Sequence, residues 1–418
     1  MRPLSSPGAP PGDPPRNRYD REVRPIAHDL PTSIARAVGR VAGRQLDPGQ
    51  AAWLAGVPAL LLLMPSTIPG QVFWLGLPAF VAVVLVARKV RPGPRAVLTL
   101  LLLLAAGVAL RTWLYGYGWS GVLSVTGAAI DRVRAGLSPW NVGYPNSIPP
   151  GEPFPYGPTE LAWYWPFALL RLDLRWVEFA CSCALLVALA ARGRPIGLAV
   201  AAFTPVLAMV ASDGSNDTSA GIVLLAALLL AKRGSIRGGV GLGIAGGFKF
   251  HALAWAPGLV MIGGLPALAA LVLASLAIWA PALLLVGPGP ILASLRWAEG
   301  LHDWAGWSLA GFIQSFVGGK VPSWPFAITR WAGGALVVGA VVVDAWRRRP
   351  AALSWGAFLA GGLAIFLVVL YASYWSTHGY LAQVAPILCW EVDDLAGALP
   401  VHRLVPASRR RPVASVLQ

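Results

Sequence analysis

The ionisable residues that could do chemistry are few, and they stand where long apolar runs begin, break or end. An unpaired charge at membrane depth is costly, so such residues are candidates for function by default. Asp213 and Asp217 separate two apolar runs, and Glu160 stands near the start of another. Lys249 and His251 interrupt a further run. A carboxylate can accept a proton from an attacking hydroxyl, and cations can stabilise a phosphate as negative charge develops on it.

Aromatic residues accompany these charges. Tyr156 precedes Glu160, and Tyr380 follows His378 at another predicted membrane boundary. Flat aromatic faces suit sugar rings, and the chain has 19 Trp. The residue types therefore predict one external cavity for a lipid phosphate that carries a sugar. Lys249, His251, Tyr156, His378 and Tyr380 would bind it, and Asp217, Asp213 or Glu160 would act as the base.

Each of these residues also has a purely structural interpretation. Asn216 or Asp217 could cap the helix that follows, and Lys249 could extend its ammonium toward a lipid headgroup. His378 could be a hydrogen-bonded interface histidine. Glu160 could pair with Arg111 or with an external arginine.

The composition indicates which elements must position these residues. Of 418 residues, 56% are hydrophobic and only 12% charged, against about 25% charged in soluble domains. Mean hydropathy is +0.63, and several runs are long enough to cross a hydrocarbon layer of about 30 Å. A soluble enzyme, a secreted disulfide scaffold and a disordered chain are excluded. We predict an all-α, polytopic transmembrane bundle with about 10–11 membrane segments.

The net charge of +15 does not indicate nucleic acid, because the basic residues cluster at the ends of the apolar runs. That distribution is typical of cytoplasmic loops, and the composition suggests a bacterial plasma membrane with both termini cytoplasmic. No signal peptide is expected. No P-loop or H-E-x-x-H motif is present, so we expect neither a cofactor nor a bound metal.

The chain divides into three parts. Residues 1–50 are expected to form a cytoplasmic disordered tail with a short amphipathic helix at 33–46, and residues 396–418 a basic cytoplasmic tail. Residues 51–395 form the transmembrane domain. Its apolar segments are 51–65, 71–87, 96–113, 159–191, 196–211, 217–231, 238–262, 264–287, 326–345, 351–371 and 377–390.

Counting crossings gives one inconsistency, which locates a turn. Residues 114–158 and 288–325 fall outside, each with a surface-lying helix, at 121–135 and 290–303. Three apparent crossings then separate Arg237 from Arg347, although both should be inside. The count is repaired if 238–262 enters and turns back near Lys249. Such a turn is tolerated only beside protein or water, so all the candidate residues would face one external cavity.

Five short stretches resemble one known family. They are Gly136–Asn141, Phe154–Pro158, Ser215–Asp217, Phe248–Leu253 and His378–Trp390. They are similar to the bacterial GT-C superfamily of membrane glycosyltransferases, in particular its polyprenyl-phosphate-mannose-dependent group. The resemblance implies transfer of a sugar such as mannose from a polyprenyl phosphate to a lipid or glycan acceptor, outside the cytoplasm.

One position departs from the family pattern. Such enzymes usually place a catalytic Asp early in the first external loop, where this chain has Gly121. Glu160, Asp213 and Asp217 are the substitutes we expect. Two other functions stay open, namely a transporter or flippase for lipid-linked sugars and a catalytically silent relative that scaffolds other envelope proteins.

Overall fold

The computed structural model describes residues 93–116, 120–301, 308–348, 355–377 and 379–395. Both predicted tails, the amphipathic helix at 33–46, the apolar segments 51–65 and 71–87, and His378 lie outside these residues.

The described residues are mostly helical, as predicted, with one two-stranded sheet. The helices are α4 (Pro94–Trp113), α5 (Val122–Arg134), α6 (Pro158–Leu169), α7 (Arg175–Ala191), α8 (Pro195–Phe203), α9 (Pro205–Val210), α10 (Asp217–Lys232), α11 (Ser235–Phe248), the 3-10 helix η2 (Phe250–Trp255), α12 (Ala256–Val286), α13 (Pro288–Leu301), α14 (Leu309–Val317), α15 (Trp324–Arg348), α16 (Trp355–Ala372), α17 (Gly379–Ala382) and α18 (Ala385–Leu395). Strands β1 (Gly143–Tyr144) and β2 (Glu152–Pro153) pair antiparallel, with Gly143 opposite Pro153. Two predicted segments are broken: 196–211 into α8 and α9, and 377–390 into α17 and α18.

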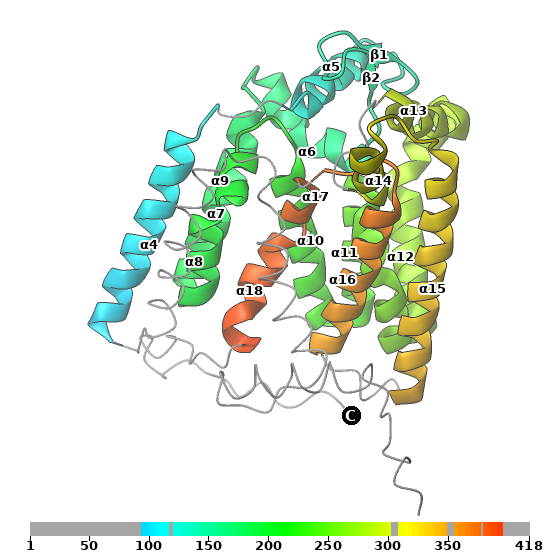
Figure 1. Cartoon of the computed structure of the whole chain (residues 1–418). Coiled ribbons are helices and arrows are strands. Elements are labelled where there is room, and N and C mark those ends of the chain that lie inside the picture. The colour runs from blue at the N-terminus through cyan, green and yellow to red at the C-terminus, as the bar shows by residue number, and fades with distance from the viewer. Residues whose placement is uncertain (1–92, 117–119, 302–307, 349–354, 378, 396–418) are drawn as a thin grey trace, which may run out of the picture.

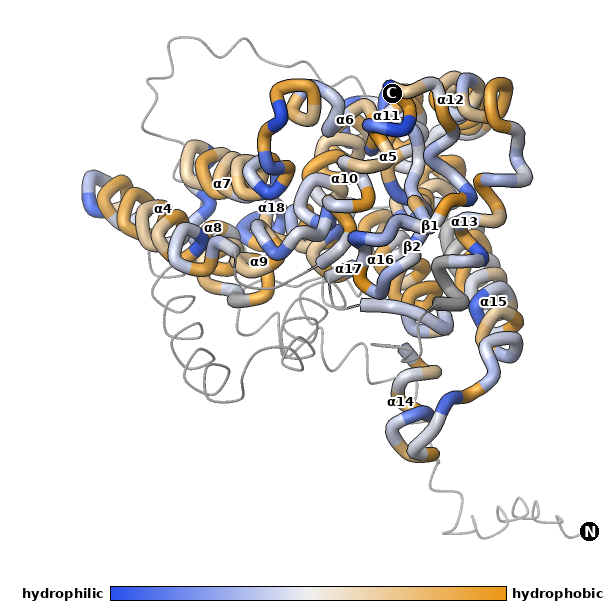
Figure 2. The backbone as a smooth tube through the Cα atoms, turned by 90° about the horizontal axis from the view of Figure 1, so that it is seen from above, coloured by the Kyte–Doolittle hydropathy of each residue, from blue (hydrophilic) through white to orange (hydrophobic). Residues whose placement is uncertain are grey.

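Three helical stretches of the described residues are long and apolar enough to cross a membrane: Pro94–Trp113, Phe250–Val286, which is interrupted at Gly264, and Trp355–Ala372. The exposed faces of α4 and α12 carry large apolar side chains, and Leu284 and Leu285 of α12 are 86% and 84% exposed. Seen from above, α4 is hydrophobic over most of its length (Figure 2). Water would not tolerate such surfaces, whereas lipid chains would cover them. The structure therefore supports association with a membrane.

The chain reverses where the sequence predicts a turn. Helix α11 ends because Lys249 is extended, with φ −138° and ψ 132°, and η2 leads the chain back. Gly263, near the end of the return, packs directly against Ser235 at the start of α11. At Gly264 (φ 60°), inside α12, the chain reverses again. The part of α12 that follows Gly264 then lies along α11. A Cβ at Gly239 would stand 2.5 Å from Ala267 O, so glycine permits this close backbone contact.

One end of the bundle is capped by α5, the small sheet and α13 (Figure 1). Helices α5 and α13 match the predicted surface helices at 121–135 and 290–303. The cap joins segments far apart in sequence, because the Asn141 N–H donates to Ser294 Oγ in α13 at 2.6 Å. The cap therefore closes the bundle at the end where α6 and α10 begin.

At the opposite end, α18 holds the start of α8. The Asp393 carboxylate accepts hydrogen bonds from the N–H groups of Ile196 (3.0 Å) and Gly197 (2.7 Å), which open α8. Arg194 pairs with Asp394 at 2.8 Å. These contacts supply the acceptors that a helix N-terminus lacks and fix α18 in the bundle.

Candidate functional site

The centre of the site is a buried ion pair between Asp217 and Lys249. Asp217 is the first residue of α10, and Lys249 stands at the break between α11 and η2. Lys249 Nζ lies 2.5 Å from Asp217 Oδ1, and both side chains are 5% exposed. Gln383 Nε2, between α17 and α18, donates to the same oxygen at 2.8 Å. Three segments far apart in sequence therefore meet at one carboxylate.

Two tyrosine rings enclose the Lys249 ammonium. Its Nζ lies 5.1 Å from the centre of the Tyr156 ring and 5.3 Å from that of Tyr380, within the range of a cation–π contact. The His251 ring lies 4.9 Å from the Tyr380 ring. Backbone contact brings Tyr156 here, since a Cβ at Gly157 would collide with Gly247 O just before the break. Glycine at 157 is therefore needed for the segment that carries Tyr156 to approach the segment that carries Lys249.

Glu160 lies beside this pair in a separate hydrogen-bonded cluster. It is fully buried, and it accepts hydrogen bonds from Thr126 Oγ1 and Asn216 Nδ2, each at 2.6 Å. Both oxygens of Glu160 are therefore engaged by neutral donors. The second carboxylate oxygen of Asp217, Oδ2, lies next to Gly379. A Cβ at Gly379 would stand 2.7 Å from this oxygen.

Asp213 lies in the loop that leads into α10. Its Oδ1 accepts the Ser215 N–H at 2.8 Å, and its carbonyl oxygen accepts the Ser120 N–H at 2.6 Å. Burial raises the pKa of Asp213 from 3.8 to about 6, an effect partly opposed by the hydrogen bond from Ser215. Asp213 thus links the segment just before α5 to the segment just before α10, and its carboxyl can take up a proton near neutral pH.

Several buried polar atoms around the ion pair have no hydrogen-bond partner among the described residues. They are Asn216 Oδ1, Ser215 Oγ, Thr159 Oγ1 and His251 Nδ1. Buried polar groups are nearly always satisfied, so each exception needs an explanation. These four atoms therefore carry hydrogen-bonding capacity that the described residues do not use.

Gly121 occupies its position because there is no room for a side chain. A Cβ there would stand 2.5 Å from Ile148 N, and it would also crowd the backbone of Ser147. The Ser147 hydroxyl in turn accepts the Glu152 N–H at 2.7 Å. Burial raises the pKa of the Glu152 carboxyl from 4.5 to about 7. The cap therefore carries a buried carboxyl at 152, and its packing excludes one at 121.

The structure brings most of the predicted site residues together. Asp217, Lys249, His251, Tyr156 and Tyr380 form one contact network. Glu160 and Asp213 adjoin it through the residues just before Asp217. His378 lies outside the described residues, although the next residue, Gly379, touches Asp217.

Three structural interpretations are wrong. The N-cap of α10 is Asn216, and Asp217 bonds to a lysine instead of capping the helix. Lys249 does not extend to the surface, because it is buried against Asp217. Arg111 does not pair with Glu160; its guanidinium donates to Ser182 Oγ and to carbonyl groups at the end of α8.

Sequence reasoning missed Glu178 and Gln383. Glu178 is fully buried in α7, where it accepts hydrogen bonds from the hydroxyl groups of Tyr164 and Ser219. An acid inside the apolar run 159–191 was the available signal. No such signal exists for Gln383. In the part of the chain that the structure describes, no group of three or more His, Cys, Asp or Glu residues is arranged to hold a metal ion.

Comparison with protein-family models, curated proteins and solved structures gives no match.

Proposed function

We propose that this protein is a polytopic membrane glycosyltransferase of the GT-C type. It transfers a sugar, such as mannose, from a polyprenyl phosphate to a lipid or glycan acceptor on the extracytoplasmic face. The observation that carries the proposal is the buried Lys249, held by Asp217 between two tyrosine rings. A lysine enclosed in this way is a preorganised site for a phosphate.

The reaction would proceed by displacement at the anomeric carbon. The acceptor hydroxyl oxygen forms the new bond, and the bond from that carbon to the phosphate oxygen breaks. The leaving phosphate keeps the electron pair, and Lys249 stabilises its added charge. The hydroxyl proton passes to a carboxylate. Of the three, Asp217 is our candidate, because it contacts Lys249 directly, whereas both oxygens of Glu160 accept hydrogen bonds from neutral donors and Asp213 Oδ1 accepts the Ser215 N–H.

The unpartnered polar atoms support a sugar as the transferred group. Asn216 Oδ1, Ser215 Oγ and His251 Nδ1 lie on the segments that carry Asp217 and Lys249. Sugar hydroxyls can satisfy such donors and acceptors, and the rings of Tyr156 and Tyr380 offer apolar faces to the ring carbons. The length and apolar composition of α4, α12 and α16 agree with a multi-pass arrangement, in which the cap of α5 and α13 would be external.

The experiment is a transfer assay with purified protein in lipid nanodiscs, supplied with a radiolabelled polyprenyl-phosphate mannose and a membrane lipid extract as acceptor. We expect Lys249→Met and Asp217→Asn to lower the rate at least about 100-fold, as loss of a charge-stabilising donor does elsewhere. The matched control is Lys232→Met, which removes an exposed lysine. Wild-type activity in Lys249→Met would contradict the proposed site, and no transfer by the wild type would contradict the function.

The broken helices favour one other candidate, a transporter for lipid-linked sugars. The chain is non-helical at Lys249 and again at Gly264, and discontinuous helices also form transporter binding sites. A dithionite-quenching assay with a fluorescent polyprenyl phosphate in proteoliposomes distinguishes the two. Movement of the lipid between leaflets without sugar transfer would favour the transporter.

A further inference from the structure

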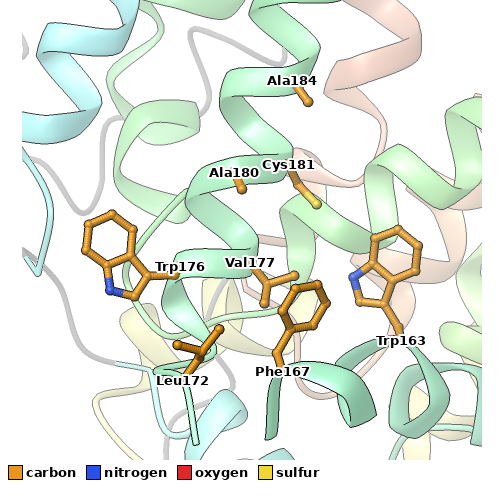
Figure 3. Close-up of a pocket in the computed structure, with 8 residues that line it drawn as sticks. All are labelled: Trp163, Phe167, Leu172, Trp176, Val177, Ala180, Cys181 and Ala184. Carbon is orange, nitrogen blue, oxygen red and sulfur yellow. The ribbon is translucent and has the colours of Figure 1, made fainter. Parts of the chain in front are cut away.

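An apolar groove lies between α6 and α7, close to the ion pair but outside it (Figure 3). Its volume is about 320 Å³, at the lower end of the range for small-molecule sites. The lining residues are Trp163, Phe167, Leu172, Trp176, Val177, Ala180, Cys181 and Ala184. Because that lining has no charged side chain, the groove suits a hydrocarbon chain. A polar ligand would lose its hydrogen bonds to water there without gaining equivalent ones.

The inner end of the groove adjoins the ion-pair site. Trp163, at that end, packs edge-on against Phe248 with ring centres 6.4 Å apart, and Phe248 is the residue before Lys249. The Trp163 indole N–H also donates to Ser219 Oγ at 3.1 Å, and Ser219 lies in the first turn of α10 with Asp217. One side chain therefore separates the groove from the segments that hold the charges.

The other end of the groove opens outward. Trp176 is 52% exposed and Leu172 47% exposed, and the short connection from α6 to α7 also exposes Leu170. Trp176 stacks on Tyr115, which follows the end of α4, with ring centres 4.5 Å apart. An aromatic rim on an apolar exterior is typical of the interface between headgroups and lipid chains. A chain could therefore enter from the bilayer without crossing water.

We propose that this groove binds the first part of the hydrocarbon chain of the lipid phosphate whose phosphate lies at Lys249. The inference rests on the proposed function and adds to it a place for the lipid tail and a role for α6 and α7. Trp163 forms the wall over which the chain passes from groove to phosphate site. The groove is continuous with the segments that carry Lys249 and Asp217. This continuity favours a lipid whose phosphate binds at Lys249 over a bulk phospholipid.

The test is photolabelling, which does not depend on turnover. Protein in phosphatidylcholine nanodiscs is irradiated with a decaprenyl phosphate that carries a diazirine near the phosphate end of its chain. We expect labelled peptides from α6 and α7, including Trp163 or Cys181. Ala180→Phe and Ala184→Phe, which fill the groove from exposed positions, should each reduce labelling at least fivefold. Val187→Phe, an exposed position of α7 that does not line the groove, should leave it unchanged.

Three results would overturn the groove. They are equal labelling in Ala180→Phe, Ala184→Phe and wild type, no competition by a tenfold excess of unlabelled decaprenyl phosphate, and labelling confined to other helices. In the transfer assay, the filled-groove variants should lose at least fivefold in kcat/KM with decaprenyl donors but not with a two-isoprene donor. Labelling of the groove without any transfer would contradict the glycosyltransferase and leave the lipid site standing, so the two failures are distinguishable.

Discussion

The buried pair of Asp217 and Lys249 gives the sharpest prediction, because its structural and chemical roles can be separated. Lys249→Met leaves the Asp217 carboxylate 5% exposed and without its cation, although the Gln383 side chain still donates a hydrogen bond to it. Asp217→Asn leaves an uncompensated buried ammonium. Breaking a buried pair from one side costs about 3–5 kcal/mol, so we expect each single variant to be destabilised by that amount.

The double variant Asp217→Asn, Lys249→Met should recover most of that loss, because neither buried charge remains. Replacing both partners of a buried pair is often close to neutral. We therefore expect a coupling free energy of about 3 kcal/mol or more, well above the deviation of about 0.5 kcal/mol found for independent sites. Activity should stay absent, since the double variant restores the packing but not the cation.

The assay is unfolding by added SDS in mixed micelles, followed by tryptophan fluorescence, with sugar transfer measured on the same samples. Arg134→Met is the control for an exposed pair. Arg134 pairs with Asp131 at 3.2 Å, and their side chains are 46% and 72% exposed, so its loss should cost at most about 1 kcal/mol. Additive single effects would refute a coupled pair. Recovered activity in the double variant would refute the role of Lys249 in phosphate binding.

Three further predictions concern the cap and the opposite end. Gly121→Asp should lower the free energy of unfolding by about 1–3 kcal/mol, because its Cβ would stand 2.5 Å from Ile148 N. A transfer activity above that of the wild type would show that the protein accommodates an acid at 121, and would contradict this prediction. Since the folded-state pKa of Glu152 is about 7 against 4.5, its stabilising effect is full below pH 4.5 and is lost as pH rises through 7; thermal midpoints should fall over this range, and Glu152→Gln should remove the part of the fall due to Glu152 and leave the part due to Asp213, whose pKa is also raised. Asp393→Ala should cost about 1–2 kcal/mol of unfolding free energy, because the N–H groups that open α8, including that of Gly197, lose their acceptor; an unchanged midpoint would refute the cap.

Local sequence patterns were enough to predict the position of the long apolar helices. Long apolar runs predict α4, α10 and α16 within a few residues, because in such runs the hydrogen-bonding needs of the backbone are met within one helix. Arg171 and Asp173 mark the interruption between α6 and α7, and Gly264 marks the second reversal. The odd number of predicted crossings between Arg237 and Arg347 predicted the turn at Lys249.

The sequence by itself indicated the membrane character, the position of most long helices and, except for Glu178, the charged residues of the candidate site. It could not determine which of them touch, because that depends on close backbone contacts between distant segments. Only the tertiary structure decided that Lys249 pairs with Asp217 and not with Glu160, and that Gln383 joins them. Gly157 packed on Gly247 and Gly379 beside Asp217 bring these segments within hydrogen-bonding distance. No spacing along the chain encodes such contacts.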